Sequence, residues 1–223
     1  MATTHELNSS PETCHWGYFG SQLKPSLRIR SGDIATIHCV SGSAEILPGD
    51  PFNVLPEHRE ILGKLKPHLG RHILTGPVYV EGAERGDTLA VEVLDIKFRT
   101  NWGWNVQRPL AGTLPEDFPF YKLTHIPIDS NRGVCTLPWG LEVELRPFFG
   151  IMGVAPPPEW GQCSSIEGGS AAGAPRVSAI DDRPDSALRM RGRSATRSST
   201  EPPRSRRARS ASRISMRACA SRR

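Results

Sequence analysis

Residues 88–98 read TLAVEVLDIKF, and this stretch indicates the fold class of the chain. Leu89, Val91 and Val93 share one parity, while the residues between them are a mixture of apolar and charged types. A period of two is typical of a β-strand that buries one of its faces. The sequence therefore predicts a strand over residues 88–98, with its second face only partly exposed to water.

Further short runs of branched and aromatic residues recur between Gly and Pro residues, and each has the length of a strand. They predict strands at residues 27–30, 34–40, 78–80, 125–128, 134–137 and 141–148. In the last run Leu141, Val143 and Leu145 alternate with charged residues, which predicts an apolar inner face and a charged outer face. One short helical pattern, at residues 56–66, stops before Pro67.

Many short strands with one short helix predict an all-β fold, most simply a β-sandwich. A barrel and an α+β fold remain as alternatives. A Gly-Asp pair precedes two of the predicted strands, at Gly32-Asp33 and Gly86-Asp87. Glycine supplies a positive φ and aspartate supplies a local hydrogen bond, so both pairs predict tight turns and a structural role for the aspartates.

The chemistry of the chain changes after Glu167. All of the histidines and aromatic residues precede that position, whereas residues 168–223 hold 14 Arg, 11 Ser and 10 Ala without a single Lys. Such a segment buries too little apolar area to offset the entropy of ordering its backbone. We predict two parts: a folded body over residues 1–167 and a disordered basic tail over residues 168–223.

Charge divides the same way, because the tail carries ten excess positive charges and the body is mildly acidic. The basic tail favours non-specific binding to polyanions, so a non-catalytic β-domain with a nucleic-acid-binding arm is one hypothesis. No window holds the roughly 18 consecutive apolar residues of a membrane span, and the five scattered cysteines form no CxxC pair. We expect a cytoplasmic protein with reduced thiols and without a specific nucleic-acid site.

The body resembles the acetamidase/formamidase family of linear-amide hydrolases. Residues 75–96 (TGPVYVEGAERGDTLAVEVLDI) are the most similar stretch, and the resemblance extends in order over residues 27–38, 101–114, 146–156 and 160–167. It implies hydrolysis of formamide or acetamide to ammonia and a carboxylic acid by a cytoplasmic homo-oligomer with a β-sandwich fold. It also leaves open a divalent metal ion.

The resemblance ends where the family continues into a His-Gly-Gly-Asn loop, a Gly-Asp-Gly-His segment and a Gly-Asp-Gly-Glu segment. Here Glu167 is followed by GGSAAGAPRVSAIDD, and no histidine follows His125. An Arg-rich, Lys-free composition is typical of GC-rich codons read out of frame. We therefore expect a reading-frame shift after Glu167 and an impaired hydrolase.

Amide hydrolysis needs an activated water or nucleophile, an oxyanion-stabilising group and an acid for the leaving ammonia. The candidates in the body are Glu167, at the edge of the family's site loop; His15, in the aromatic run CHWGYFG; and Asn105, beside Trp102 and Trp104. His15 and the tryptophans also fit ordinary packing roles.

Two other patterns are weaker. The four-residue spacing of His68 and His72 suits a metal only on a helix, and Pro67 and Gly70 disfavour one. Cys163 lacks the sequence context of a nucleophile.

Overall fold

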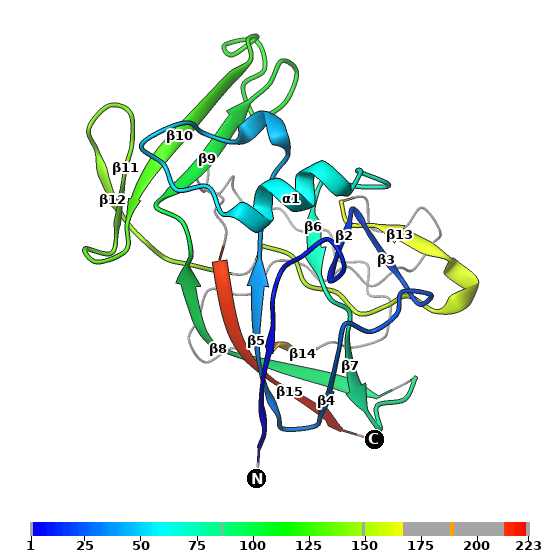
Figure 1. Ribbon diagram of the computed structural model, residues 1–223. Helices are drawn as coiled ribbons and strands as arrows, with labels where there is room; N and C mark the ends of the chain where they lie inside the picture. Colours follow the sequence, from blue (N-terminus) through cyan, green and yellow to red (C-terminus); the bar gives the residue numbers. More distant parts are fainter. Residues whose placement is uncertain (1, 86, 149, 167–187, 190–211, 222–223) are drawn as a thin grey trace.

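The computed structural model describes residues 2–85, 87–148, 150–166, 188–189 and 212–221. Within these residues the chain is built from short strands around one α-helix, α1 (Pro56–Lys64), with two 3-10 turns (Figure 1). The all-β prediction is confirmed. None of the described helices is long and apolar enough to cross a bilayer.

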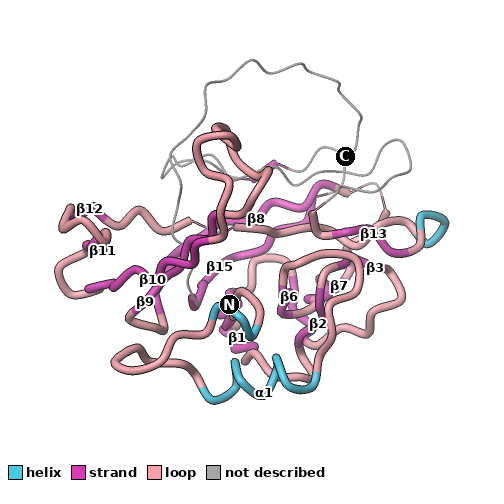
Figure 2. Tube along the Cα trace, turned by 90° about the horizontal axis from the view of Figure 1, so that it is seen from above, coloured by secondary structure: helices cyan, strands magenta, loops and turns pink. Residues whose placement is uncertain are grey.

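The strands, in chain order, are β1 (Thr4–Leu7), β2 (Cys14–Trp16), β3 (Tyr18–Gly20), β4 (Leu27–Arg30), β5 (Ile34–Cys39), β6 (Ile73–Thr75), β7 (Val78–Glu81), β8 (Thr88–Phe98), β9 (Trp102–Gln107), β10 (Lys122–Asp129), β11 (Val134–Thr136), β12 (Glu142–Glu144), β13 (Gln162–Ser164), β14 (Leu188–Arg189) and β15 (Ser212–Ser221). The largest sheet has the order β1-β5-β15-β8-β14, and a second has the order β12-β11-β10-β9. Three two-stranded ladders join β2 to β6, β3 to β13 and β4 to β7. Figure 2 shows β2, β3, β6, β7 and β13 on the same side of the long strands β8 and β15.

The main core lies between the five-stranded sheet and the β4–β7 ladder. Ala35, Ile37 and Val91 are buried in it from the large sheet, and Leu27 and Val78 pack against it from the ladder. Two β layers that share one apolar interior are the arrangement expected of a sandwich.

Strand β8 has the predicted bounds, but its alternation changes phase in the middle. Ser215 of β15 pairs with Asp95 and Met216 pairs with Val93, so Leu94 is left without a partner in the register. This β-bulge places Leu94 at 42% exposure, while Ile96, two residues further on, packs against the core. One extra residue thus keeps both halves of the strand apolar on the same face.

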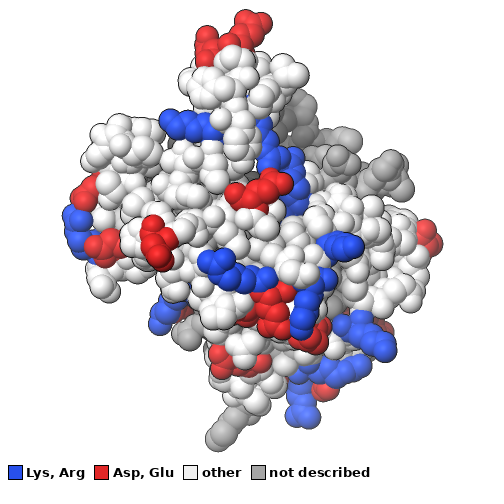
Figure 3. Space-filling model, turned by 45° about the horizontal axis from the view of Figure 1, so that its top comes forward, with Lys and Arg blue, Asp and Glu red and all other residues white. Residues whose placement is uncertain are grey.

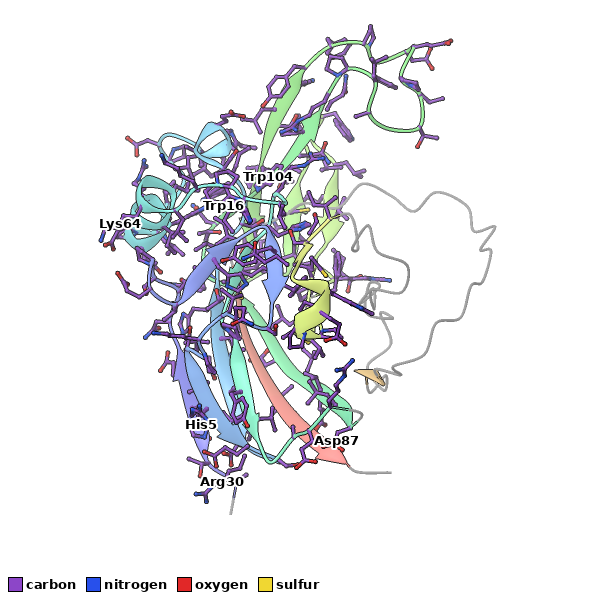
Figure 4. The ribbon with its side chains drawn as sticks, turned by 90° about the vertical axis from the view of Figure 1, so that its right-hand side faces the viewer. His5, Trp16, Arg30, Lys64, Asp87 and Trp104 are labelled. Atoms are coloured by element: carbon purple, nitrogen blue, oxygen red, sulfur yellow. The ribbon has the colours of Figure 1, made fainter. Side chains whose placement is uncertain are left out.

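The Gly32-Asp33 turn is confirmed, with Gly32 at φ +89°, and Asp87 accepts the N–H of Glu84, while Gly86 lies outside the described residues. Asp33 accepts the backbone N–H of Arg30 at 2.9 Å and that of Thr3 at 2.9 Å, and its second contact is with His5 Nε2 at 3.0 Å. These backbone hydrogen bonds and His5 lower the pKa of Asp33 to about 2. Figure 4 shows His5 and Arg30 together at the end of the sheet where β1 and β5 begin. Asp33 therefore ties strand β1 to the start of β5.

Helix α1 ends at Lys64, two residues earlier than predicted, because Leu65 is already extended. Ile61 is fully buried against Trp16 and Val40. An ion pair between Glu57 and Arg99 joins the first turn of the helix to the residue that follows β8. The helix therefore closes one end of the β layers.

The prediction for residues 141–148 is wrong in length and in burial. Strand β12 is only three residues long, and Leu141 and Val143 are 54% and 40% exposed. β12 is an edge strand of its sheet, and all three of its residues are exposed, so its alternating pattern does not sort into a buried and an exposed face. Leu145 packs inward, against the cluster around Ile128.

Two parts of the predicted disordered tail, β14 and β15, are described as strands. Strand β15 lies between β5 and β8 and pairs with both, as the red strand in Figure 1 shows. Amino-acid composition does not predict such pairing, because the unpaired N–H and C=O groups of two neighbouring strand edges can bind any extended segment. The rest of the tail lies outside the described residues.

Candidate functional site

Three segments distant in sequence meet beside the β3–β13 ladder. The backbone N–H of Gly17, between β2 and β3, donates to the carbonyl of His72 at 2.8 Å. The carbonyl of Gly17 accepts the N–H of Ser165 at 2.8 Å. Ser164 Oγ donates to the carbonyl of Leu69 at 3.0 Å. The Gly17 turn therefore holds both the 66–72 loop and the end of β13.

Glycine is required where these backbones touch. Gly17 has φ +94°, and a Cβ there would lie 2.4 Å from the backbone nitrogen of Gly70. A Cβ on Gly70 would in turn lie 2.4 Å from Ser165 Oγ. The contact fixes the position of Ser165, the last described buried residue before Glu167.

We predict that Gly17→Ala destabilises the fold more than Gly32→Ala. Both glycines have positive φ, but Gly32 has open space where a Cβ would lie, so only conformational strain of about 1 kcal/mol is expected there. At Gly17 a backbone clash adds to the strain, and we expect a total loss of about 3 kcal/mol or more. Urea unfolding of the two variants measures the difference, and equal losses would show that the contact of Gly17 with Gly70 is not tight.

Imidazole, phenol and hydroxyl groups gather on this junction. Tyr18 makes edge contacts with His15 and His68, at centroid separations of 5.3 and 5.2 Å. His72 Nδ1 lies 3.1 Å from Ser165 Oγ, within hydrogen-bond distance. We call these five residues, His15, Tyr18, His68, His72 and Ser165, the histidine cluster. It is the candidate functional site.

Within the cluster His15 has the electrostatic character of a proton acceptor. Its Nδ1 is buried and has no hydrogen-bond partner among the described residues. Burial lowers the pKa of His15, although backbone groups of Gly76 and Tyr18 oppose the shift. Because the pKa is lowered, the ring is neutral near pH 7. Its Nδ1 carries a lone pair or an N–H that no described residue binds.

Of the two predicted site residues that the structure describes, His15 and Asn105, His15 lies in this cluster and Asn105 does not. Glu167, the third, lies outside the described residues. Asn105 is on β9 opposite Thr124, whereas Trp104 is opposite His125, so neighbouring positions put Asn105 on the other face of the hairpin from the tryptophan. Trp102 is a core residue whose Nε1 donates to the carbonyl of Asn53 at 2.8 Å. The predicted grouping of Asn105 with the tryptophans is therefore wrong.

The other histidines have mostly structural surroundings. His125 Nε2 lies 2.8 Å from the carbonyl of Ile46, which anchors the loop before α1. As predicted, His68 and His72 do not lie on a helix. His68 Nε2 lies 2.7 Å from Gln162 Oε1. The approach of His72 to Ser165 was missed, because no local pattern relates two residues 93 positions apart.

The described residues do not fit a metal centre. Across the described ranges, no three His, Cys, Asp or Glu side chains come close enough to hold a metal ion. The imidazoles of His68 and His72 contact Gln162 and Ser165 instead. We therefore derive no chemical step through a metal.

The chain has clear similarity to known proteins. The model of the acetamidase/formamidase family matches residues 61–213. The structure of an acetamidase from Bacillus halodurans aligns with 96% of this chain and 70% of its own, at a TM-score of 0.67 and 20% identity. A predicted acetamidase/formamidase from Thermoanaerobacter tengcongensis aligns with 99% of this chain and 70% of its own, at 0.65 and 17%. A gamma lactamase from Delftia acidovorans aligns with 97% and 68%, at 0.59 and 18%. No match was found among curated proteins.

Proposed function

Because this chain belongs to the acetamidase/formamidase family, we propose that its body serves hydrolysis of the C–N bond of small linear amides such as formamide and acetamide. The products are ammonia and a carboxylic acid. The observation that supports this most is the histidine cluster, which lies at the end of β13, directly before Glu167. The cluster supplies proton-transferring groups at the position where the resemblance locates the family's site loop.

In this proposal His15 takes the proton of the attacking water. A neutral imidazole with an unpartnered buried nitrogen suits that role, and the same group returns the proton to the departing ammonia. His72 and Ser165 position the end of β13 rather than react, since their side chains contact each other and Ser165 is bound through its backbone to Gly17. Glu167 remains the carboxylate candidate that the resemblance implies.

We further propose that the 223-residue chain is impaired. Residues 168–223 contain none of the His-Gly-Gly-Asn, Gly-Asp-Gly-His and Gly-Asp-Gly-Glu segments of the family. A frame shift after Glu167 would account for their absence together with the Arg-rich composition. The match of the family model as far as residue 213 speaks against a shift at that exact position. Resequencing the locus tests this cause directly, because a shifted frame must encode those segments.

We predict that a frame-corrected chain releases ammonia from formamide or acetamide at least about 100-fold faster than the 223-residue chain. Loss of a single general acid or base already costs about 10²–10⁴-fold in rate. A coupled ammonia assay at saturating amide measures both proteins. Equal turnover by the two chains would contradict the proposed impairment.

A variant of the corrected chain tests the assignment of His15. His15→Gln is expected to lower kcat by about 100-fold or more, because the amide has no proton-accepting nitrogen in the neutral range. His5→Gln is the matched control, since His5 lies on β1 against Asp33 rather than in the histidine cluster. Similar losses in the two variants would remove His15 from the mechanism.

The alternative, a non-catalytic domain with a nucleic-acid-binding arm, has less support. On the face shown in Figure 3, Lys and Arg side chains are interspersed with Asp and Glu. Phosphate binding is strongest where positive side chains are clustered. On that face the described Lys and Arg side chains therefore do not form a cluster of the kind that binds phosphate.

We also propose that the protein is a cytoplasmic homo-oligomer, as the resemblance implies. Exposed apolar side chains on two hairpin loops support this. They are Leu110, Leu114, Phe118, Phe120 and Tyr121 on one loop and Trp139 and Leu141 on the other. Apolar surface of this kind is typical of subunit contacts.

A further inference from the structure

Helix α1 is a marginal element that depends on its contacts with the strands. It has nine residues, Gly63 lies near its end, and no side chain caps its first turn. Isolated helices of this length are marginal in water. The attachment of α1 therefore depends on contacts such as the packing of Ile61, which is fully buried, and the ion pair between Glu57 and Arg99.

The buried face of α1 carries an imidazole without a hydrogen-bond partner. His58 lies one turn before Ile61 and is 1% exposed, and no described residue binds either of its ring nitrogens. A neutral ring can remain in such a place, whereas a charged ring would lose its hydration without gaining an acceptor. The closed position of the helix therefore requires His58 to be neutral.

The charged groups around His58 do not compensate for its burial. Burial lowers the pKa of His58 to about 4; Glu57 opposes this shift, and Arg59 and Arg99 add to it. Glu57 is itself paired with Arg99 and also interacts with His38 of β5. Although burial acts against it, hydrogen bonds from its own backbone and from Arg99 lower the pKa of Glu57 from 4.5. The ion pair therefore stays charged in mild acid, where His58 titrates.

Strand β2 lies between α1 and the histidine cluster. Cys14 and Trp16 are buried in the apolar core that contains Ile61 of the helix. His15, between them, faces the opposite way and contacts the ring of Tyr18. β2 has three residues, and β6 is its one partner strand among those that the structure describes. Departure of the helix would therefore uncover Cys14 and loosen the strand that carries His15.

We propose that α1 is a pH-sensitive cover of β2, which opens locally when His58 takes up a proton in mild acid and thereby loosens the strand that carries His15. The opening is local because the main core and the cluster around Ile128 contain no residue of α1. Its consequence for the histidine cluster rests on the proposed function. The opening itself does not, and it is measured without any hydrolysis.

Thiol labelling of the unmodified 223-residue chain tests the opening. Cys14 is 7% exposed in the core that contains Ile61, and Cys135 is 8% exposed in the separate cluster around Ile128. Methyl methanethiosulfonate labels each thiol when it becomes exposed, and mass spectrometry of the peptides gives the two rates at pH 7 and at pH 5. Each rate is divided by that of the same cysteine in the urea-unfolded chain, which removes the pH dependence of the reagent.

We expect Cys14 to be labelled faster than Cys135 at both pH values, because a local opening needs less free energy than global unfolding. The open helix binds a proton at His58 near pH 6.5, and the closed helix does so only near pH 4. The opening constant, and with it the corrected rate for Cys14, should therefore rise about 20-fold from pH 7 to pH 5. Equal rates for Cys14 and Cys135 at pH 5 would overturn the proposal, since global unfolding would then expose both thiols.

Two variants separate the role of His58 from that of the helix. In His58→Leu the rise in the Cys14 rate between pH 7 and pH 5 should disappear, because leucine does not titrate. In Gly63→Ala the Cys14 rate should fall about threefold at both pH values, because alanine favours the helix and its added Cβ meets open space. An unchanged rise in His58→Leu, or a Cys14 rate that Gly63→Ala does not slow, would overturn the proposal.

Discussion

Replacing Trp102 by alanine is expected to lower the free energy of unfolding by about 3–5 kcal/mol. Trp102 is 2% exposed, packs edge-on against His125 and donates its Nε1 hydrogen to the carbonyl of Asn53. The substitution leaves a large cavity and an unpaired carbonyl. For a domain of this size the loss corresponds to a fall in Tm of roughly 6–20 °C.

Trp139→Ala is the matched control for this measurement. Trp139 has the same side chain but is 73% exposed, so its removal should change stability by less than about 0.5 kcal/mol. Urea unfolding followed by far-UV circular dichroism compares the two variants. If Trp139→Ala were the more destabilising substitution, the β9–β10 hairpin would not pack on the body as described.

The second large effect is a loss of stability in mild acid caused by His58. His58 is 1% exposed on α1, and neither ring nitrogen has a hydrogen-bond partner among the described residues. Burial lowers its pKa to about 4; the positive charges of Arg59 and Arg99 contribute, and Glu57 opposes them. The unfolded chain binds a proton near the ordinary value of 6.5, whereas the folded chain does so only near 4.

The sign follows from that difference. Between pH 6.5 and 4 the unfolded state holds more protons than the folded state, so acidification favours unfolding. The stability present above pH 6.5 is lost as the pH falls to about 4, and the full loss is on the order of 3 kcal/mol. Asp33 acts in a lower window, since its pKa of about 2 makes its contribution fall only below the ordinary value of 3.8.

His58→Leu isolates this contribution. Leucine has a similar volume and does not titrate, so the variant should lose less stability between pH 6.5 and 4 than the parent chain. Urea unfolding at several pH values in that window provides the comparison. Identical pH dependence in the two proteins would mean that His58 takes up a proton in the folded chain as readily as in the unfolded chain.

Local patterns were sufficient for much of the fold. The alternation in residues 88–98 predicted β8 with its bounds, and the two Gly-Asp pairs predicted turns that Asp33 and Asp87 do stabilise, with Asp87 accepting the N–H of Glu84 at 2.8 Å. These features depend on steric and hydrogen-bonding preferences within a few residues. The sequence contains them directly.

The candidate site was predicted less well, because it depends on distances between remote residues. The aromatic run around His15 drew attention to one member of the histidine cluster. The approach of His72 to Ser165 follows from the contact between Gly17 and Gly70, which leaves no periodic trace in the sequence. Asn105 looked like a neighbour of Trp104, yet adjacent strand positions point to opposite faces.

The amino-acid sequence alone determined the β character of the body, its turns and its family, since each is encoded by short-range pattern or by motif order. Only the tertiary structure decided which side chains meet at the Gly17 turn, why Leu94 is exposed, and that Ser212–Ser221 pairs with β5 and β8. These outcomes depend on strand partners far away in the chain. Backbone groups at a strand edge accept any extended segment that keeps the register, and composition carries no information about that register.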